Sequence, residues 1–203
     1  DVERSRGLGD VYKRQLIMKG LGWFIYFWQV DISRYPKCGE EIIVGTFAYE
    51  DRGSSEERNF YIKTVRDDII VRANSVWSLV DLAKLQIMRI PNEVMDRNRK
   101  RNEDKLDMEY LGRRIRYSGE CNIRKVGEHI VSRLELDSNR HLNNSEYIKI
   151  ALATIADFNP SSVTRLCIEY RKQAVEGDLL NIFLAREDEM IIDIRSDSGE
   201  SFA

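Results

Sequence analysis

Residues 41–82 read EIIVGTFAYEDRGSSEERNFYIKTVRDDIIVRANSVWSLVDL, and this stretch decides the fold. Its β-branched and aromatic residues predict strands, which polar turn residues separate. A strand with alternating polar and apolar residues is also predicted at residues 29–32, before the break at Tyr35-Pro36 and Gly39. The remaining predicted strands are residues 41–50, 58–65 and 69–82, with turns at residues 51–57 and at Asp67-Asp68. The sequence therefore predicts an antiparallel meander.

The second half of the chain repeats this pattern. Strands are predicted at residues 129–136, 163–170, 178–186 and 190–195, and a turn at residues 196–199 precedes the start of a last strand. Aligning Gly39-Glu40-Glu41-Ile42 with Glu176-Gly177-Asp178-Leu179 makes Ala73 the counterpart of Ala203. We therefore expect two copies of one unit, the second lacking most of its final strand.

A helix is predicted in front of the second set of strands. Asn143 and Glu146 have the spacing of a capping box, and Asn159-Pro160 is a stop signal. Between them, apolar residues recur at helical spacing, namely Ile148, Ala151, Leu152 and Ile155. The first copy has too little chain before Trp23 for such a helix unless residues 1–15 supply it. We therefore expect an α+β fold in which the first unit lacks its helix.

These patterns predict four segments. Residues 1–15 contain Asp-Val-Tyr-Lys-Arg-Gln at 10–15, which resembles the translated end of a transposon used in sequencing libraries, so a non-native origin is expected. Residues 16–90 form an N-terminal unit, 91–116 a charged linker and 117–203 a C-terminal unit. On this interpretation the sequence is a fragment, truncated at both ends.

Composition excludes several classes of protein. The 32 basic and 34 acidic side chains nearly cancel, which argues against a dedicated nucleic-acid binder. With 42% hydrophobic residues the chain is too apolar to be intrinsically disordered, and no apolar run is long enough to span a membrane. Cys38, Cys121 and Cys167 form no CxxC pair, so neither a disulfide framework nor a zinc site is indicated, and a reducing, cytoplasmic setting is expected.

The charged linker has two interpretations. Acidic residues dilute its basic ones, which favours a solvated connector. The alternative is a docking site for an acidic partner, formed by residues that include Arg97, Arg99 and Arg101.

One segment, Asp137 to Tyr147, concentrates side chains that could carry chemistry. If the chain is extended there, Asp137, Asn139 and His141 at i, i+2 and i+4 point to the same side. The helix that follows offers unpaired backbone N–H groups, which suit a developing oxyanion. Such a group of residues could polarise a carbonyl and position water, with Asp137 or His141 handling the proton. The other histidine, His129, is expected to be a surface residue at the start of a strand.

The pattern Asp-x-Asn-x-His-x-Asn-Asn-x-x-Tyr resembles the signature of the acyl-acyl carrier protein (acyl-ACP) thioesterases. The resemblance extends from about Leu21 to Ala203 and includes Ile32-Ser33-Arg34-Tyr35-Pro36 and Ser75-Val76-Trp77. It implies a tandem (double) hot-dog fold, in which antiparallel sheets wrap helices and the N-terminal unit binds the acyl chain. It further implies hydrolysis of fatty acyl-ACP thioesters in fatty acid biosynthesis without cofactor or metal. Catalysis is assigned to Asp137, Asn139 and His141.

A fourth catalytic position departs from the family's plant members. Tyr170-Arg171-Lys172-Gln173-Ala174 aligns with a Tyr-Arg-Arg-Glu-Cys context, so Gln173 replaces a glutamate. Glutamine can hold water but cannot take a proton. Three alternatives remain open: an acyl-ACP thioesterase, an acyl-CoA thioesterase and a non-catalytic acyl-binding relative. The expected partner is acyl carrier protein, with neither nucleic acid nor membrane span, and oligomeric state is left open, a homodimer included.

Overall fold

A computed structural model describes residues 19–92, 105–117, 122–156, 158–186 and 189–203. The chain divides into two compact units, which are described separately below. Unit 1 contains the chain up to Leu111 together with Thr164–Leu166, and unit 2 contains Gly112–Val163 and Cys167–Ala203. The predicted absence of a first helix falls on residues 1–18, outside the described residues.

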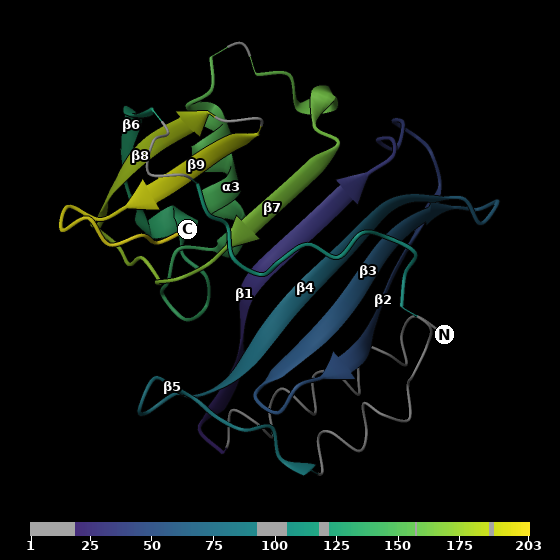
Figure 1. Ribbon diagram of the computed structural model, residues 1–203, viewed down its shortest axis with the longest axis horizontal. Helices are drawn as coiled ribbons and strands as arrows, with labels where there is room; N and C mark the ends of the chain where they lie inside the picture. The colour runs from purple at the N-terminus through teal and green to yellow at the C-terminus, as the bar shows by residue number, and fades with distance from the viewer. Residues whose placement is uncertain (1–18, 93–104, 118–121, 157, 187–188) are drawn as a thin grey trace. The chain divides into compact units, whose positions relative to one another are not determined.

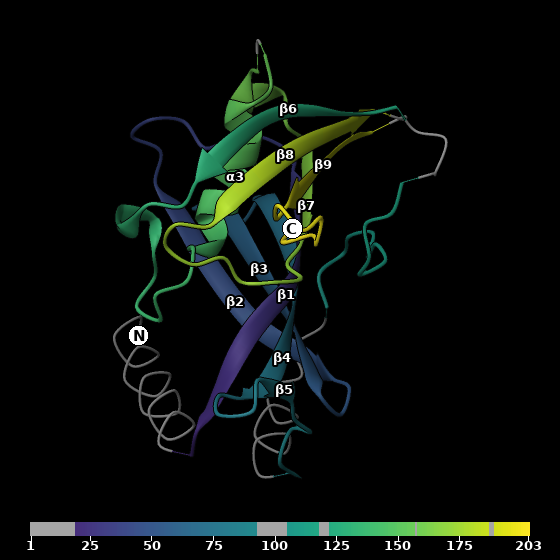
Figure 2. The same ribbon diagram turned by 90° about the vertical axis from the view of Figure 1, so that its left-hand side faces the viewer.

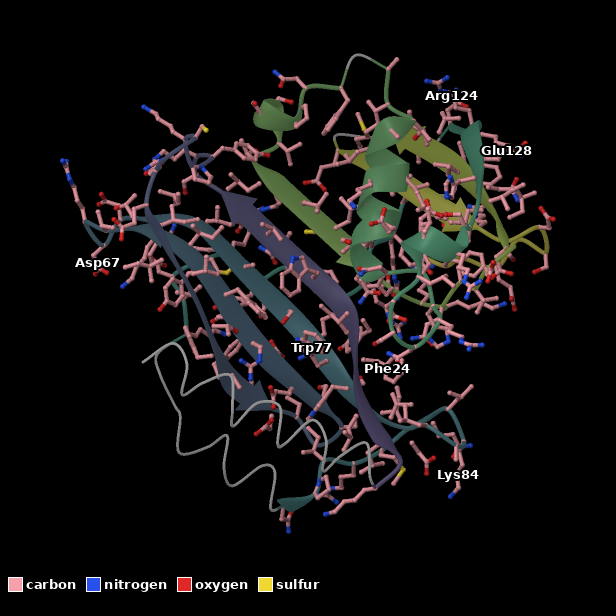
Figure 3. All side chains as sticks on the ribbon, turned by 180° about the vertical axis from the view of Figure 1, so that it is seen from behind. Phe24, Asp67, Trp77, Lys84, Arg124 and Glu128 are labelled. Carbon is pink, nitrogen blue, oxygen red and sulfur yellow. The ribbon has the colours of Figure 1, made fainter. Side chains whose placement is uncertain are left out.

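Unit 1 is an antiparallel sheet (Figure 1). Four strands run in the order β2-β3-β4-β1, and the short β5 pairs with β4. Figure 3 places Asp67, in the β3–β4 turn, and Lys84, in the β4–β5 turn, at opposite ends of this sheet. The predicted meander is thus confirmed, with the strand bounds β1 Leu21–Ile32, β2 Ile42–Asp51, β3 Ser55–Thr64, β4 Ile69–Asp81 and β5 Gln86–Ile87.

Two strands of unit 1 are longer than predicted. β3 starts at Ser55 because the turn before it is tight, with Gly53 at a φ of 74° that glycine adopts without strain. β1 starts at Leu21, so the aromatic run from Trp23 to Trp28 lies in a strand. Phe27 is buried and Trp28 contacts Phe60 with ring centroids 4.8 Å apart, so both aromatic residues contribute to the packing of unit 1.

Part of the predicted linker packs on the sheet of unit 1. In Lys105–Leu111, half-buried side chains alternate with exposed ones. The fully buried amide of Gln29 donates to the carbonyl of Glu109 at 2.8 Å and accepts the N–H of Leu111 at 3.1 Å. We call Lys105–Leu111 the strap. The prediction of a solvated connector is wrong for these residues, because buried amides of the sheet bind the strap backbone.

A second buried amide holds the other end of the strap. Asn59 Oδ1 accepts the N–H of Leu106 at 3.1 Å and the hydroxyl of Tyr110 at 3.0 Å. The ammonium of Lys105 lies 4.2 Å from the centroid of the Tyr110 ring, a cation–π contact. Arg97, Arg99 and Arg101, the proposed docking residues, lie outside the described residues.

Unit 2 packs a helix on a second antiparallel sheet (Figure 2). The sheet has the order β6-β8-β9, and its strands are β6 Ile123–Ile130, β8 Leu179–Arg186 and β9 Met190–Arg195. Two short 3-10 turns, η1 (Arg133–Glu135) and η2 (Pro160–Ser162), precede and follow the helix α3 (Asn144–Ala153). The strand β7 (Arg165–Glu169) is not part of this sheet, and its first two residues belong to unit 1. The core joins α3 to the sheet through Tyr147, Ile150, Leu180, Ile182 and Ile194.

Two predictions for unit 2 need correction. The strand expected at residues 129–136 is β6, which ends at Ile130, because the chain turns into η1. The helix ends at Ala153 rather than at Asn159-Pro160, so Ile155 lies beyond it. Thr154 accounts for this end, because both its hydroxyl and its N–H donate to the carbonyl of Ala151.

The register of the repeat also differs from the sequence alignment. Arg195 pairs with Ser201, as Lys63 pairs with Ile69 in unit 1. The backbone of Ile194 then hydrogen-bonds to both Phe202 and Ala203. At the corresponding place in unit 1, Ile62 pairs with Val71 next to a bulge. The counterpart of Ala203 is therefore Val71, not Ala73. Both hairpins contain the same irregularity, which strengthens the prediction of a repeat.

Candidate active site

The Asp137–His141 segment forms a tight loop, not the extended segment that we expected. Leu136 and Leu142 pair at its base, and the N–H of Asp137 donates to the carbonyl of His141 at 2.8 Å. Arg140 has a φ of 64°, which a continuous strand does not allow. The loop forms because an aspartate side chain readily binds backbone N–H groups two to four residues ahead.

Asp137 holds this loop together. Its Oδ1 accepts the backbone N–H of Asn139 at 2.8 Å and that of His141 at 3.1 Å. Its Oδ2 lies 3.5 Å from the side-chain Nδ2 of Asn139. The structure thus brings the three predicted residues together, but through contacts of Asp137 with the backbone. Asp137 therefore stabilises the conformation of the loop, in addition to any role in proton transfer.

The ring of His141 has an unusual environment. The residue is half-buried, and its Nδ1 is buried without a hydrogen-bond partner among the described residues. A buried polar atom left unpaired costs about 1–3 kcal/mol, so such atoms in native proteins often serve binding or catalysis. The unpaired nitrogen therefore marks His141 as a candidate functional residue of this loop.

Gln173 belongs to the segment that runs beside this loop. His141 pairs with Val175, and the N–H of Leu142 donates to the carbonyl of Ala174 at 2.8 Å. This register brings Gln173 opposite Asn143, close to the loop along the backbone. The Gln173 side chain is exposed and hydrogen-bonds to no described residue, so its amide can reach a ligand.

The start of α3 follows the prediction in part. Asn143 is the N-cap, and its Oδ1 accepts the N–H of Ser145 at 3.0 Å. The reciprocal half of a capping box is not formed. The N–H of Asn143 donates instead to the carbonyl of Glu135 at 2.9 Å, and Glu146 pairs with Lys149. Oxyanion stabilisation by this helix end stays a prediction.

Tyr147 has a role that the sequence analysis missed. Its hydroxyl accepts the N–H of Ala174 at 2.9 Å, and its ring meets that of Tyr170 edge-on at 5.7 Å. Burial raises the pKa of Tyr147 to about 12, so the hydroxyl stays neutral. Tyr147 thereby fastens the segment that carries Gln173 to α3. The sequence shows the spacing between His141 and Tyr147, but it carries no signal for the hydrogen bond between Tyr147 and the distant Ala174.

Other predicted features lie away from this loop. Among the described residues, no group of three or more His, Cys, Asp and Glu side chains could hold a metal ion, and no described helix could cross a membrane. Cys167 is half-buried and Cys38 is exposed, and neither is in a disulfide.

The sequence matches two family models. Residues 2–97 match the acyl-ACP thioesterase N-terminal domain, and residues 120–201 match the acyl-ACP thioesterase C-terminal domain. The chain belongs to the acyl-ACP thioesterase family. The first match begins inside the segment 1–15, whose non-native origin stays a prediction.

Curated relatives of this acyl-ACP thioesterase family member come from plants. A chloroplastic acyl-acyl-carrier-protein hydrolase from Cuphea viscosissima is 25% identical over 186 residues. A chloroplastic palmitoyl-acyl carrier protein thioesterase from Cuphea hookeriana is 25% identical over 183 residues. Each alignment covers 88% of this chain but only 43% of the relative, so the chain spans less than half the length of these proteins.

Solved structures show the same fold. An acyl-ACP thioesterase from Bacteroides thetaiotaomicron aligns with a TM-score of 0.80 at 18% identity, covering 94% of this chain and 77% of that one. The 12:0-ACP thioesterase from Umbellularia californica aligns with a TM-score of 0.78 at 18% identity, covering 93% and 75%. The family member therefore has the tandem hot-dog fold that its sequence predicts.

Proposed function

We propose that this chain hydrolyses fatty acyl-ACP thioesters to free fatty acid and carrier protein, as a step of fatty acid biosynthesis. The observation that carries the proposal is the unpaired, buried Nδ1 of His141 on the loop that also holds Asn139. The family supports the same reaction, since its curated relatives are named as hydrolases of acyl carrier protein thioesters.

In the proposed mechanism His141 is the general base. It takes a proton from water as the water oxygen bonds to the thioester carbonyl carbon. The carbon–sulfur bond then breaks, and the proton passes to the leaving thiolate, which gives a fatty acid and a thiol. A positioned base of this kind contributes roughly 10²–10⁴-fold to the rate.

Asn139 and Gln173 supply hydrogen bonds in this scheme. Both side chains are exposed, and each carries an amide that can donate to the carbonyl oxygen or hold the water. Neither amide can accept the proton, and we assign that step to His141. Asp137 keeps the loop in the conformation that presents these groups.

Gln173 also favours a second candidate function. If the glutamate of the plant members is the essential base, a chain with Gln173 is a non-catalytic acyl-binding protein. The two candidates differ in turnover, because an acyl-binding protein would bind the acyl carrier protein thioester without releasing the thiol.

The test is thiol release from acyl-ACP and, in parallel, from acyl-CoA. The proposal expects hydrolysis that His141→Ala abolishes, with acyl-ACP the better substrate. Hydrolysis that His141→Ala leaves unchanged would contradict the proposal. Faster turnover of acyl-CoA than of acyl-ACP would identify acyl-CoA as the substrate. Loss of carrier protein affinity on neutralising Arg97, Arg99 and Arg101 would support the docking site.

We also propose that the protein is cytoplasmic. A homodimer in solution is a further proposal. Cys38 and Cys167 are not joined in a disulfide, which supports a reducing compartment. Fractionation of cells that express the chain would test the location, and sedimentation would test the oligomeric state.

A further inference from the structure

His129 and Glu135 form a pair next to the candidate active-site loop. Nε2 of His129, near the end of β6, lies 2.9 Å from Oε1 and 3.0 Å from Oε2 of Glu135 in η1. The side chains are 31% and 19% exposed, so His129 is only partly exposed, and it lies near the end of β6 rather than at the start of a strand as expected. Burial alone would raise the pKa of Glu135, but hydrogen bonds from Ser132 and His129 outweigh it and hold that pKa below its ordinary value.

Polar contacts hold η1 in place. The turn has no buried residue, and its central Leu134 is 97% exposed, so apolar packing contributes little to its position. Glu135 Oε2 accepts the N–H of Ser132 at 2.7 Å, and His129 binds the same carboxylate from β6. The carboxylate of Glu135 therefore joins the turn to the end of the strand.

Glu135 in turn touches the base of the loop. Its carbonyl accepts the N–H of Asn143, the N-cap of α3, at 2.9 Å. The next residue, Leu136, pairs with Leu142, and the two contacts close the loop that carries His141. His129 thus binds the side chain of Glu135, the backbone of Glu135 binds Asn143 just after the loop, and the peptide bond to Leu136 connects Glu135 to the start of the loop.

We propose that His129 is a positioning residue, which sets the geometry of the Asp137–His141 loop through Glu135. This inference rests on the proposed function of that loop. His129 has no place in the proton transfer itself. Its effect arises because a small displacement of a catalytic group is costly, with a shift of about 1 Å able to lower a rate by about 10²-fold.

The neighbouring acidic residue on β6 does not compete for this histidine. Glu128 pairs with Lys125 at 2.9 Å, and consecutive side chains of a strand point to opposite faces. Figure 3 marks Glu128 and Arg124 on this strand. The pair Lys125–Glu128 therefore offers a matched control, since it is an exposed ion pair on the same strand without a contact to η1 in the described residues.

The experiment compares His129→Ala, His129→Gln and the control Lys125→Ala. It measures kcat and KM for thioester hydrolysis, and hydrogen exchange at the backbone N–H groups of His141 and Asn143. We expect His129→Ala to lower kcat by about tenfold with KM unchanged and to speed exchange at both groups. His129→Gln should keep kcat and the exchange rates close to those of the wild type, because the glutamine amide can donate a hydrogen bond to Glu135.

Two results would overturn the proposal. One is a His129→Ala variant that matches Lys125→Ala in kcat and in exchange. The other is a loss of kcat with unchanged exchange at His141, which would mean that His129 acts by another route. Exchange needs no substrate, so absence of hydrolysis in the wild-type chain would refute the proposed function while the exchange result still decides the positioning.

Discussion

Oδ1 of Asp137 accepts the backbone N–H of His141 at 3.1 Å, so the carboxylate binds the backbone of this histidine. The same oxygen accepts the N–H of Asn139 at 2.8 Å. The buried Nδ1 of His141 has no partner among the described residues. These contacts indicate different roles for the two residues: Asp137 holds the loop in its conformation, and His141 can exchange a proton.

Substitution of Asp137 tests this separation. An asparagine Oδ1 can still accept both backbone N–H groups, so Asp137→Asn should keep activity within about tenfold of wild type, whereas Asp137→Ala should lose more and destabilise the chain by about 1–3 kcal/mol. Steady-state kinetics and urea unfolding check both variants. Equal loss of activity in the two variants at full stability would assign the proton transfer to Asp137 instead.

Replacing Gln173 by glutamate should speed the reaction. Gln173 is exposed beside the loop, and a carboxylate there can accept a proton that the amide cannot. We expect Gln173→Glu to raise kcat by roughly tenfold or more and to add an acidic limb to its pH profile. The matched control is Gln173→Asn, which keeps the amide, and a gain in that variant would point to a steric cause.

Removal of the Tyr147 hydroxyl should destabilise unit 2. The N–H of Ala174 would lose its acceptor in a fully buried place, which costs about 1–3 kcal/mol. Tyr147→Phe should therefore lower the midpoint of thermal unfolding and also lower kcat, because the Gln173 segment is no longer fastened to α3. An unchanged midpoint would show that the hydrogen bond contributes nothing.

Tyr147 also predicts how stability changes at alkaline pH. Burial raises its pKa from an ordinary value near 10 to about 12, so the folded state binds its proton more tightly than the unfolded state. The contribution is fully present below pH 10 and is lost as pH rises toward 12, a change on the order of 2 kcal/mol. Tyr147→Phe should flatten this decline in denaturant titrations, and a decline of the same size in the variant would assign it to other groups.

The strap makes a prediction for unit 1. Gln29→Leu removes the amide that binds the carbonyl of Glu109 and the N–H of Leu111, and should cost about 1–3 kcal/mol in urea unfolding. Lys84→Gln, in the exposed β4–β5 turn, is the control and should leave stability unchanged. A Gln29→Leu variant as stable as this control would show that the strap is held by other contacts.

Local sequence signals predicted the parts of the fold that local interactions decide. The strands of unit 1 and the N-cap at Asn143 follow from alternation, turn residues and a side chain that bonds two residues ahead. The end of α3 was misplaced because Asn159-Pro160 is a strong stop signal, whereas Thr154 ends the helix earlier with a single hydroxyl bond.

Long-range contacts account for the remaining errors. The strap was interpreted as a connector because its charges are visible in the sequence, while the amides of Gln29 and Asn59 that bind it lie far away in the chain. The residues of the candidate site were identified by spacing. Their geometry was not, because the Asx-type bonds of Asp137 turn an expected strand into a loop.

The central claim is that His141 takes the proton in thioester hydrolysis, and its most direct test is the pH profile of kcat/KM for acyl-ACP with His141→Ala and His141→Gln beside wild type. We predict that both variants lose roughly 10²-fold or more in kcat/KM and that the remaining rate no longer follows the pH dependence of the wild type. A variant that keeps the wild-type rate or its pH dependence would contradict the assignment of His141 as the base.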